Sequence, residues 1–176
     1  MLSLAREAIL SALEGKPLHH TAWESSCLSE RQGVFVTLEV QGKLRGCIGV
    51  IEAHNPLRES IVHCAQSAAL RDSRFPPLSA DELDALQIEI SVLSVLSKMD
   101  PREIEIGTHG LVIAAGEKRG LLLPQVATEQ HLSREQFLQE TCRKAGLSRH
   151  AWQESATSVY GFTCEIFRED SRSANA

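Results

Sequence analysis

The sequence predicts an α+β fold with an antiparallel sheet flanked by helices, and three features support this prediction. Apolar residues recur at helical spacing in three segments, about 3–14, 57–70 and 133–145. Runs that are β-branched or alternate in polarity predict strands at 34–40, 44–51, 86–96, 111–115, 121–123 and 158–167. Helices and hairpins follow one another without the rhythm of a doubly wound parallel sheet, which favours antiparallel pairing.

Helix starts are marked by residues that can cap a backbone N–H. Asn55 is expected to cap the helix that follows it, since its side chain can accept such a bond. Ser79 with Glu82, and Ser133 with Gln136, have the three-residue spacing of a capping box. The first pair predicts a short helix after a structured loop, and the second predicts the start of the last long helix.

The longest predicted strand, 86–96, is expected to lie at the centre of the sheet. Ile88 and Ile90 project from one of its faces, and Leu93 and Val95 project from the other. A strand that is apolar on both faces is typical of a central position, buried from both sides.

Composition indicates a globular protein that folds as one domain over 1–176. The chain has 176 residues, 43% hydrophobic and 23% charged, and a formal net charge of -5. An acidic chain of this kind is a poor candidate for binding nucleic acid through phosphate contacts. No apolar run approaches a membrane span, and Arg6 and Glu7 interrupt the stretch that a signal peptide would need. We therefore expect a cytoplasmic protein that contacts neither nucleic acid nor a membrane.

The five cysteines are an odd number, so they cannot all pair within one chain. They form no C-x-x-C and lack the paired spacing of a structural zinc site, so we expect reduced thiols, no metal and no cofactor. Cys64, Cys142 and Cys164 fall on apolar faces of predicted elements. Only Cys47 lies in a segment with unusual backbone demands.

That segment, 43–49, reads Lys-Leu-Arg-Gly-Cys-Ile-Gly. Gly46 and Gly49 weaken a strand, and so predict a bulge, a bend or the close approach of another group. In a regular strand Arg45 and Cys47 project from the same face, and a guanidinium beside a thiol favours the reactive thiolate. One interpretation is therefore a reactive or ligand-contacting thiol beside an anion-binding arginine. The other is a small buried cysteine in a glycine-kinked strand.

Further candidate residues lie outside this segment. Arg71, Asp72 and Arg74 fit an ion-paired loop anchor and an anion site equally well. His109, in a turn before a strand, is a candidate general base, although a lone turn histidine is usually just exposed. His63 lies opposite the apolar stripe of its helix and is expected to be solvated.

Residues 44–49, Leu-Arg-Gly-Cys-Ile-Gly, resemble the signature of the AMMECR domain family, whose prokaryotic members are called AmmeMemoRadiSam system protein A. The resemblance continues in order along the chain and spans about 34–167. Its further segments are 72–78 (Asp-Ser-Arg-Phe-Pro-Pro-Leu), 88–96, 110–113, 120–126 and 144–147 with Trp152.

The family resemblance implies an α+β fold with a smaller subdomain and a cleft between the subdomains, near 44–49. It also implies association with a Memo-like protein and a radical SAM enzyme, while leaving the biochemical activity open. The candidates that it carries over are Arg45, Cys47, Asp72, Arg74 and Gln125. The ligand-binding residues that we expect are Arg45, Gly46, Gly49, Asp72, Arg74 and Gln125.

Three functional hypotheses follow. The leading one is an accessory protein that binds a small anionic ligand or a partner chain beside Arg45 and Cys47. The second is a cysteine-dependent hydrolase or transferase, with Cys47 as nucleophile, His109 or His63 as base and backbone amides as an oxyanion site. The third is a purely structural interaction module.

Overall fold

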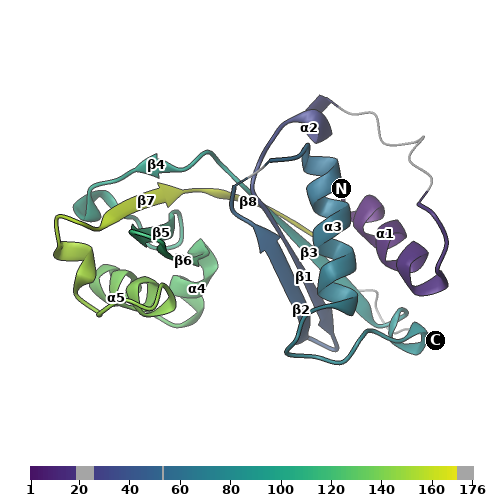
Figure 1. Cartoon of the computed structure of the whole chain (residues 1–176). Helices are drawn as coiled ribbons and strands as arrows, with labels where there is room; N and C mark the ends of the chain where they lie inside the picture. Colours follow the sequence, from purple (N-terminus) through teal and green to yellow (C-terminus); the bar gives the residue numbers. More distant parts are fainter. Residues whose placement is uncertain (19–25, 53, 170–176) are drawn as a thin grey trace. The chain divides into compact units, whose positions relative to one another are not determined.

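The computed structural model describes residues 1–18, 26–52 and 54–169. The chain divides into two compact units (Figure 1), and the first combines Met1–Leu93 with the described residues from Glu165 onward. The second unit is Ser94–Cys164. Each unit has its own antiparallel sheet and its own helices, which confirms the predicted fold class. None of the described helices has the length and apolar character of a transmembrane segment.

The first unit is a four-stranded sheet in the order β2-β1-β3-β8, so β2 is an edge strand. Its strands are β1 (Val34–Val40), β2 (Lys43–Val50), β3 (Leu86–Leu93) and β8 (Cys164–Arg168). Its helices are α1 (Leu2–Glu14), α2 (Ser26–Ser29), α3 (Leu57–Leu70) and the short 3-10 helix η2 (Ala80–Glu82). The long helices α1 and α3 pack against each other and against the sheet.

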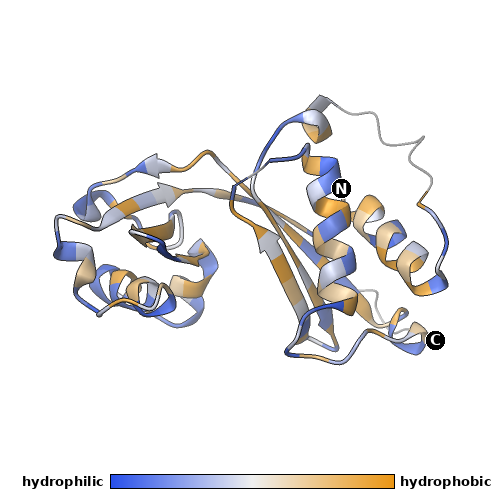
Figure 2. Cartoon of the chain, viewed as in Figure 1, coloured by the Kyte–Doolittle hydropathy of each residue, from blue (hydrophilic) through white to orange (hydrophobic). Residues whose placement is uncertain are grey.

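Alternation along the strands decides which face of this sheet is the core. Val36 of β1 and Ile88 and Ile90 of β3 are fully buried in the same cluster as the apolar stripes of α1 and α3. Figure 2 shows apolar stretches, in orange, along α1, α3 and the strands of this unit. Full burial of such an aliphatic side chain contributes roughly 1.5–3 kcal/mol. The opposite face carries Thr37 and Cys47, which lie opposite each other on β1 and β2.

The second unit has the strand order β4-β7-β5-β6. Its strands are β4 (Ser97–Lys98), β5 (Gly110–Ala115), β6 (Lys118–Leu122) and β7 (Ser158–Phe162). Its helices are α4 (Pro124–Glu129), α5 (Arg134–Lys144) and the 3-10 helices η3 (Pro101–Glu103) and η4 (Ala151–Gln153). Phe137 of α5 is fully buried against the sheet with Leu111 and Ile113. Ser133 and Gln136 form the predicted capping box.

The predicted cap of α3 is wrong. Pro56, not Asn55, is the N-cap, and its extended backbone (φ -52, ψ 147) delays the first helical residue to Leu57. The amide of Leu57 instead donates to the carbonyl of Glu30, 2.8 Å away, so no side-chain cap is needed there. The capping box of Ser79 is present as predicted, but the helix that it starts is the single 3-10 turn η2.

Two predicted strands end earlier than expected. β3 is central and largely buried, but it ends at Leu93, which leaves Val95 85% exposed. The predicted last strand is two strands, β7 and β8, which belong to different sheets. They separate at Thr163, whose N–H donates to the Ser94 hydroxyl and whose carbonyl accepts from the Ser94 N–H.

The two glycines of β2 are required by close packing, as their positions in a strand predict. A Cβ on Gly46 would lie 2.2 Å from the carbonyl oxygen of Ala68, on α3. A Cβ on Gly49 would lie 2.2 Å from the ring of Phe35, its partner on β1. Gly46 therefore sets how closely α3 approaches the sheet.

Replacing Gly46 with alanine should destabilise the fold, because the helix or the edge strand must move to admit the methyl group. We expect Gly46→Ala to lower the free energy of unfolding by about 1–3 kcal/mol, the usual range for overpacking. Lys43→Ala, at an exposed position of the same strand, is the matched control and should be near neutral. Urea denaturation followed by far-UV circular dichroism measures both, and a Gly46→Ala variant as stable as the control would contradict this packing.

Candidate functional site

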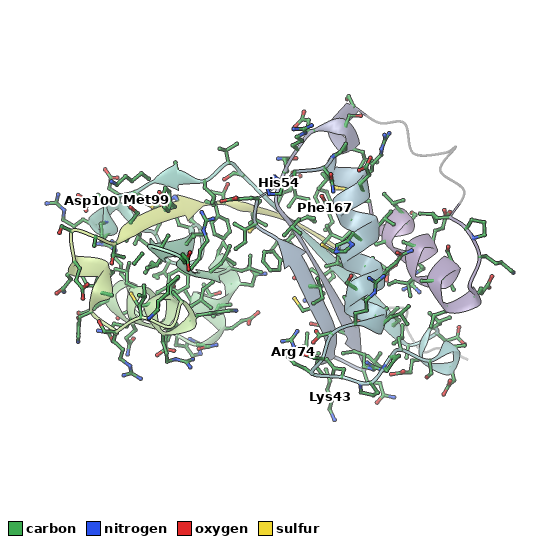
Figure 3. The ribbon with its side chains drawn as sticks, in the orientation of Figure 1. Lys43, His54, Arg74, Met99, Asp100 and Phe167 are labelled. Atoms are coloured by element: carbon green, nitrogen blue, oxygen red, sulfur yellow. The ribbon has the colours of Figure 1, made fainter. Side chains whose placement is uncertain are left out.

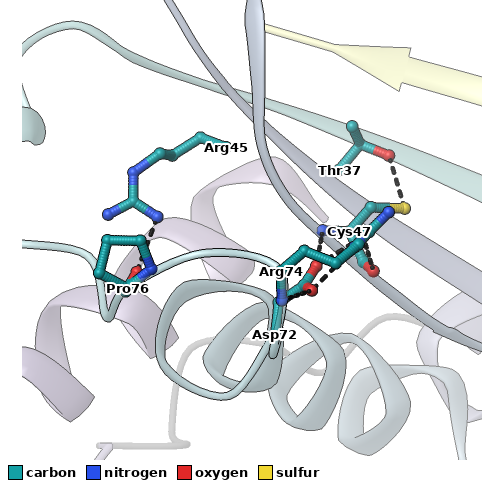
Figure 4. A network of polar contacts seen from close by, with 6 residues as sticks. All are labelled: Thr37, Arg45, Cys47, Asp72, Arg74 and Pro76. Atoms are coloured by element: carbon teal, nitrogen blue, oxygen red, sulfur yellow. Dashed lines mark hydrogen bonds and ion pairs between the residues drawn. The ribbon is translucent and has the colours of Figure 1, made fainter.

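The backbone of Cys47 is held from outside the sheet by two side chains. Cys47 lies on the edge strand, and its N–H donates to Asp72 Oδ2 at 2.9 Å. Its carbonyl accepts a hydrogen bond from Arg74 Nη2 at 3.0 Å. Figure 4 shows these bonds, and Figure 3 shows Arg74 beside β2. The ion pair of Asp72 and Arg74, here called the Asp72–Arg74 clamp, thus takes the place of a neighbouring strand at this position.

Several charge-assisted hydrogen bonds hold the two residues of the clamp together. Arg74 donates to Asp72 through Nε at 2.9 Å, Nη2 at 2.6 Å and its backbone N–H at 3.1 Å. These bonds, led by the guanidinium and joined by the Cys47 N–H, hold the pKa of Asp72 well below its usual range although burial opposes them. Asp72 is therefore a buried carboxylate whose partners are already in place. Of the two interpretations for these residues, the loop anchor describes the contacts observed.

Arg45 is the extra residue of a β-bulge. Leu38 of β1 lies opposite Gly46, but the next residue, Glu39, lies opposite Leu44, so no residue of β1 faces Arg45. The sequence prediction that Arg45 and Cys47 share a face assumed a regular strand, and the bulge removes that condition. In Figure 4 the Arg45 guanidinium lies over Pro76, away from the Cys47 thiol.

The Arg45 guanidinium fastens the loop that carries the clamp. Its Nε and Nη2 donate to the two carboxylate oxygens of Glu82 at 2.7 and 2.9 Å, a bidentate pair. Its Nη1 and Nη2 also donate to the carbonyls of Pro76 and Pro77 at 2.9 and 3.2 Å. The same pair, helped by Ser79, lowers the pKa of Glu82 to about 2. Arg45 therefore acts as an anchor between β2 and the loop.

The Cys47 thiol projects from the sheet face opposite α3 and is half-buried. The hydroxyl of Thr37, its partner on β1, donates to Sγ at 3.4 Å. The Arg74 guanidinium also lies beside this residue, because its Nη2 donates to the Cys47 carbonyl at 3.0 Å, and the Cys47 thiol is one of the groups that raise the pKa of Arg74. The guanidinium that the sequence predicts beside the thiol is thus present, and it belongs to Arg74 rather than Arg45.

Burial makes three other thiols poor nucleophiles. Cys64 and Cys142 are buried, as predicted, and burial raises the pKa of Cys64 to about 11, with a smaller contribution from nearby Cys47. Burial also raises the pKa of Cys142, and that of Cys164 to about 12. A high pKa leaves little thiolate at neutral pH.

Neither candidate histidine forms a hydrogen bond with the Cys47 thiol among the described residues. His63 is exposed on α3, on the far side of the sheet from the thiol. His109 belongs to the second unit, where its Nδ1 accepts the backbone N–H of Glu105 at 3.0 Å and closes a turn. The described residues also contain no group of three His, Cys, Asp or Glu side chains arranged to hold a metal ion.

Comparison with known proteins identifies the family. The sequence model of the AMMECR1 family matches residues 2–167. This chain belongs to the AMMECR1 family. A protein of Methanothermobacter thermautotrophicus is 44% identical over 178 residues, covering 97% of this chain and 93% of the relative. A protein of Aquifex aeolicus is 40% identical over 177 residues, covering 96% of this chain and 91% of its own length.

A solved structure shows the same fold. The crystal structure of an uncharacterised protein from Pyrococcus horikoshii superposes with a TM-score of 0.90 at 41% identity. The match covers 97% of this chain and 90% of that protein. The resemblance predicted from the sequence is thereby confirmed.

Most of the residues that the AMMECR1 resemblance carries over meet in the first unit. Around β2 the structure gathers Arg45, Cys47, Asp72 and Arg74 together with Gly46 and Gly49, and these residues have roles in packing, anchoring or the clamp. Gln125 belongs to the second unit, at the start of α4, where its side-chain oxygen is buried without a hydrogen-bond partner.

Two residues of this site were not singled out as candidates in the sequence. Thr37 is a typical strand residue, and only the register across the Gln41–Gly42 turn, corrected for the bulge, places it opposite Cys47. Glu82 is part of the predicted capping box, but its ion pair with Arg45 depends on the loop's tertiary position. Neither residue type is unusual where it stands, so composition gives no signal for them.

The carboxylates of the clamp and the anchor should make stability depend on acid pH. Both have folded-state pKa values below their unfolded values, so they stabilise the fold above about pH 4 and this stability is lost as the pH falls further. We expect Asp72→Asn to lower the free energy of unfolding at pH 7 by about 1–3 kcal/mol. In this variant the free energy of unfolding should also fall less steeply below pH 4 than it does in the wild type.

Urea denaturation at several pH values between 7 and about 2 measures this effect. Asp84→Asn removes an exposed carboxylate from the neighbouring turn and is the matched control. If Asp72→Asn had the same free energy of unfolding as the control, and the same dependence of it on acid pH, the clamp would not stabilise the fold.

Proposed function

We propose that this AMMECR1-family chain is a binding protein that holds a small anionic ligand on the Cys47 face of its first sheet. The observation that carries the proposal is the contrast between the backbone and the side chain of Cys47. Its backbone is paired on the outer side by Asp72 and Arg74, whereas its thiol remains partly accessible beside Thr37 and Arg74. A fixed backbone presenting an accessible polar side chain is a preorganised contact point.

Arg74 supplies the positive charge for such a ligand. Its side chain is 53% exposed, whereas that of Arg45 is only 13% exposed and is engaged by Glu82 and two carbonyls. The clamp uses Nε and Nη2 of Arg74, which leaves Nη1 for an incoming carboxylate or phosphate. Because Asp72 balances part of the charge, the expected affinity is modest.

The contacts give less support to a cysteine-dependent enzyme. A nucleophilic cysteine is usually activated by a base within hydrogen-bond reach. Among the described residues, the groups placed beside the Cys47 thiol are a hydroxyl and a guanidinium, and neither is a base at neutral pH. Binding is therefore the function that this geometry supports best, and the Memo-like and radical SAM proteins implied by the family are candidate users or suppliers of the ligand.

Protection of Cys47 from alkylation tests the proposal with any ligand that covers the thiol. In a Cys27→Ser background, which removes the exposed thiol, iodoacetamide should modify Cys47 first. We expect at least one member of a panel of small carboxylates and phosphates to slow that modification, as followed by mass spectrometry. Arg74→Gln should abolish the protection, whereas Arg71→Gln, at an exposed arginine of the same loop, should retain it.

A purified Memo-like protein and a purified radical SAM protein belong in the same assay as separate arms. Protection by either protein, with none by the small anions, would replace the ligand by a partner chain. Alkylation at one unchanged rate in every arm would contradict a binding role for this face.

A further inference from the structure

The sheet face that carries Cys47 has a row of polar side chains running across its strands. Cys47 on β2 lies opposite Thr37 on β1, which in turn lies opposite Glu89 on β3. Arg168 of β8 ends the row, with Nη2 2.7 Å from Glu89 Oε2. Because neighbouring strands lie about 4.8 Å apart, the row from Cys47 to Glu89 spans about 10 Å.

Ser91 adds an unused polar group to this face. It follows Glu89 by two residues on the same strand, so it projects from the same side of the sheet. Its side chain is 1% exposed, and its hydroxyl oxygen has no hydrogen-bond partner. Leaving a buried hydroxyl unpaired costs about 1–3 kcal/mol, so a hydrogen-bond partner supplied from outside the fold would be stabilising at this position.

Glu89 offers a second unused acceptor beside Ser91. Its side chain is only 13% exposed, and Arg168 donates to Oε2 through both Nε and Nη2. The other carboxylate oxygen, Oε1, makes no contact among the described residues. Phe35 lies between Gly49 and Ser91 on the neighbouring row and gives this end of the face an apolar flank. Two acceptor atoms at the β3 end of the row, Ser91 Oγ and Glu89 Oε1, thus have no donor, while the β2 end carries the donor groups of Arg74.

We propose that the ligand of this face is a small zwitterion, with its carboxylate at Arg74 and its ammonium group at Glu89 and Ser91. This inference rests on the proposed function and adds the second half of the ligand. The ammonium supplies the donors that Ser91 Oγ and Glu89 Oε1 lack, and a ligand about as long as the row from Cys47 to Glu89, about 10 Å, places one charged group at each end. An apolar chain between them lies along Thr37, Cys47 and the ring of Phe35.

Matched probes separate the two ends of this ligand. The extended chain of 8-aminooctanoate has the required spacing, octanoate lacks its ammonium, and octylamine lacks its carboxylate. Titration followed by backbone amide NMR gives the affinity for each. We expect 8-aminooctanoate to bind about tenfold more tightly than octanoate, as one additional charged hydrogen bond would give.

Two variants test whether Glu89 and Ser91 cause that preference. Ser91→Ala removes an unpaired buried hydroxyl, so it should keep or raise the free energy of unfolding while it weakens 8-aminooctanoate binding severalfold and leaves octanoate unchanged. Glu89→Gln should act on the same probe in the same direction. A gain in stability with no change in affinity would show that Ser91 is only a packing defect and would overturn the inference.

The outcomes also distinguish this inference from the proposed function. Equal binding of octanoate and 8-aminooctanoate, both weakened by Arg74→Gln, would overturn the zwitterion and leave the anion site standing. Tighter binding of octylamine than of either carboxylate would overturn both. Binding by none of the three probes would also overturn the zwitterion, and the alkylation assay would then decide the anion site on its own.

Discussion

The N–H and the carbonyl of Cys47 point outward from an edge strand, and one ion pair satisfies both of them. An unpaired edge exposes backbone groups that are costly to bury and liable to pair with another chain. The Asp72–Arg74 clamp closes the edge at Cys47 and ties the loop after α3 to the sheet. Arg45, raised out of register by the bulge, fastens the same loop a second time through Glu82. The glycine-bracketed segment and the Asp-Ser-Arg-Phe-Pro-Pro-Leu segment therefore hold each other in place through these hydrogen bonds.

These contacts give the family segments a structural role, which affects how their residues are interpreted for function. Arg45, Gly46, Gly49 and Asp72 are occupied by anchoring and packing, so their presence does not by itself mark a ligand contact. These residues fix the position of the Cys47 thiol on the sheet face opposite α3, with Thr37 on one side and Arg74 close by. The functional chemistry then depends on few atoms, and those atoms continue as a row toward Glu89.

Local signals in the sequence predicted the fold well, and tertiary effects account for the errors. Helical stripes, capping boxes and strand patterns are short-range, and they gave the α+β class and most of the elements. The six-residue helix α4 (Pro124–Glu129) was missed because it is too short for a clear apolar period. The break at Thr163 depends on Ser94, 69 residues away, which no local pattern reports.

The sequence predicted most of the residues of the candidate site, but not how they are arranged in space. Gly46 and Gly49 indicated close packing correctly, since a glycine within a strand has few other causes. A single bulge residue, however, removes the regular register on which the predicted geometry depends, so the guanidinium beside Cys47 is that of Arg74, while Arg45 anchors the loop through Glu82. Bulges have no reliable local signature, and for this reason Arg74 could not be assigned to the thiol from the sequence.

Hydrogen exchange at the amide of Cys47 tests the clamp most directly. In the wild type this amide should be protected although it faces away from β1, because it donates to Asp72. In Asp72→Ala it should exchange roughly ten- to a hundredfold faster, which corresponds to losing about 1–3 kcal/mol of local protection. The amide of Ile48, which faces β1, should keep its wild-type rate. An unchanged rate at Cys47 in Asp72→Ala would contradict the account, because the edge would then be held by something other than the clamp.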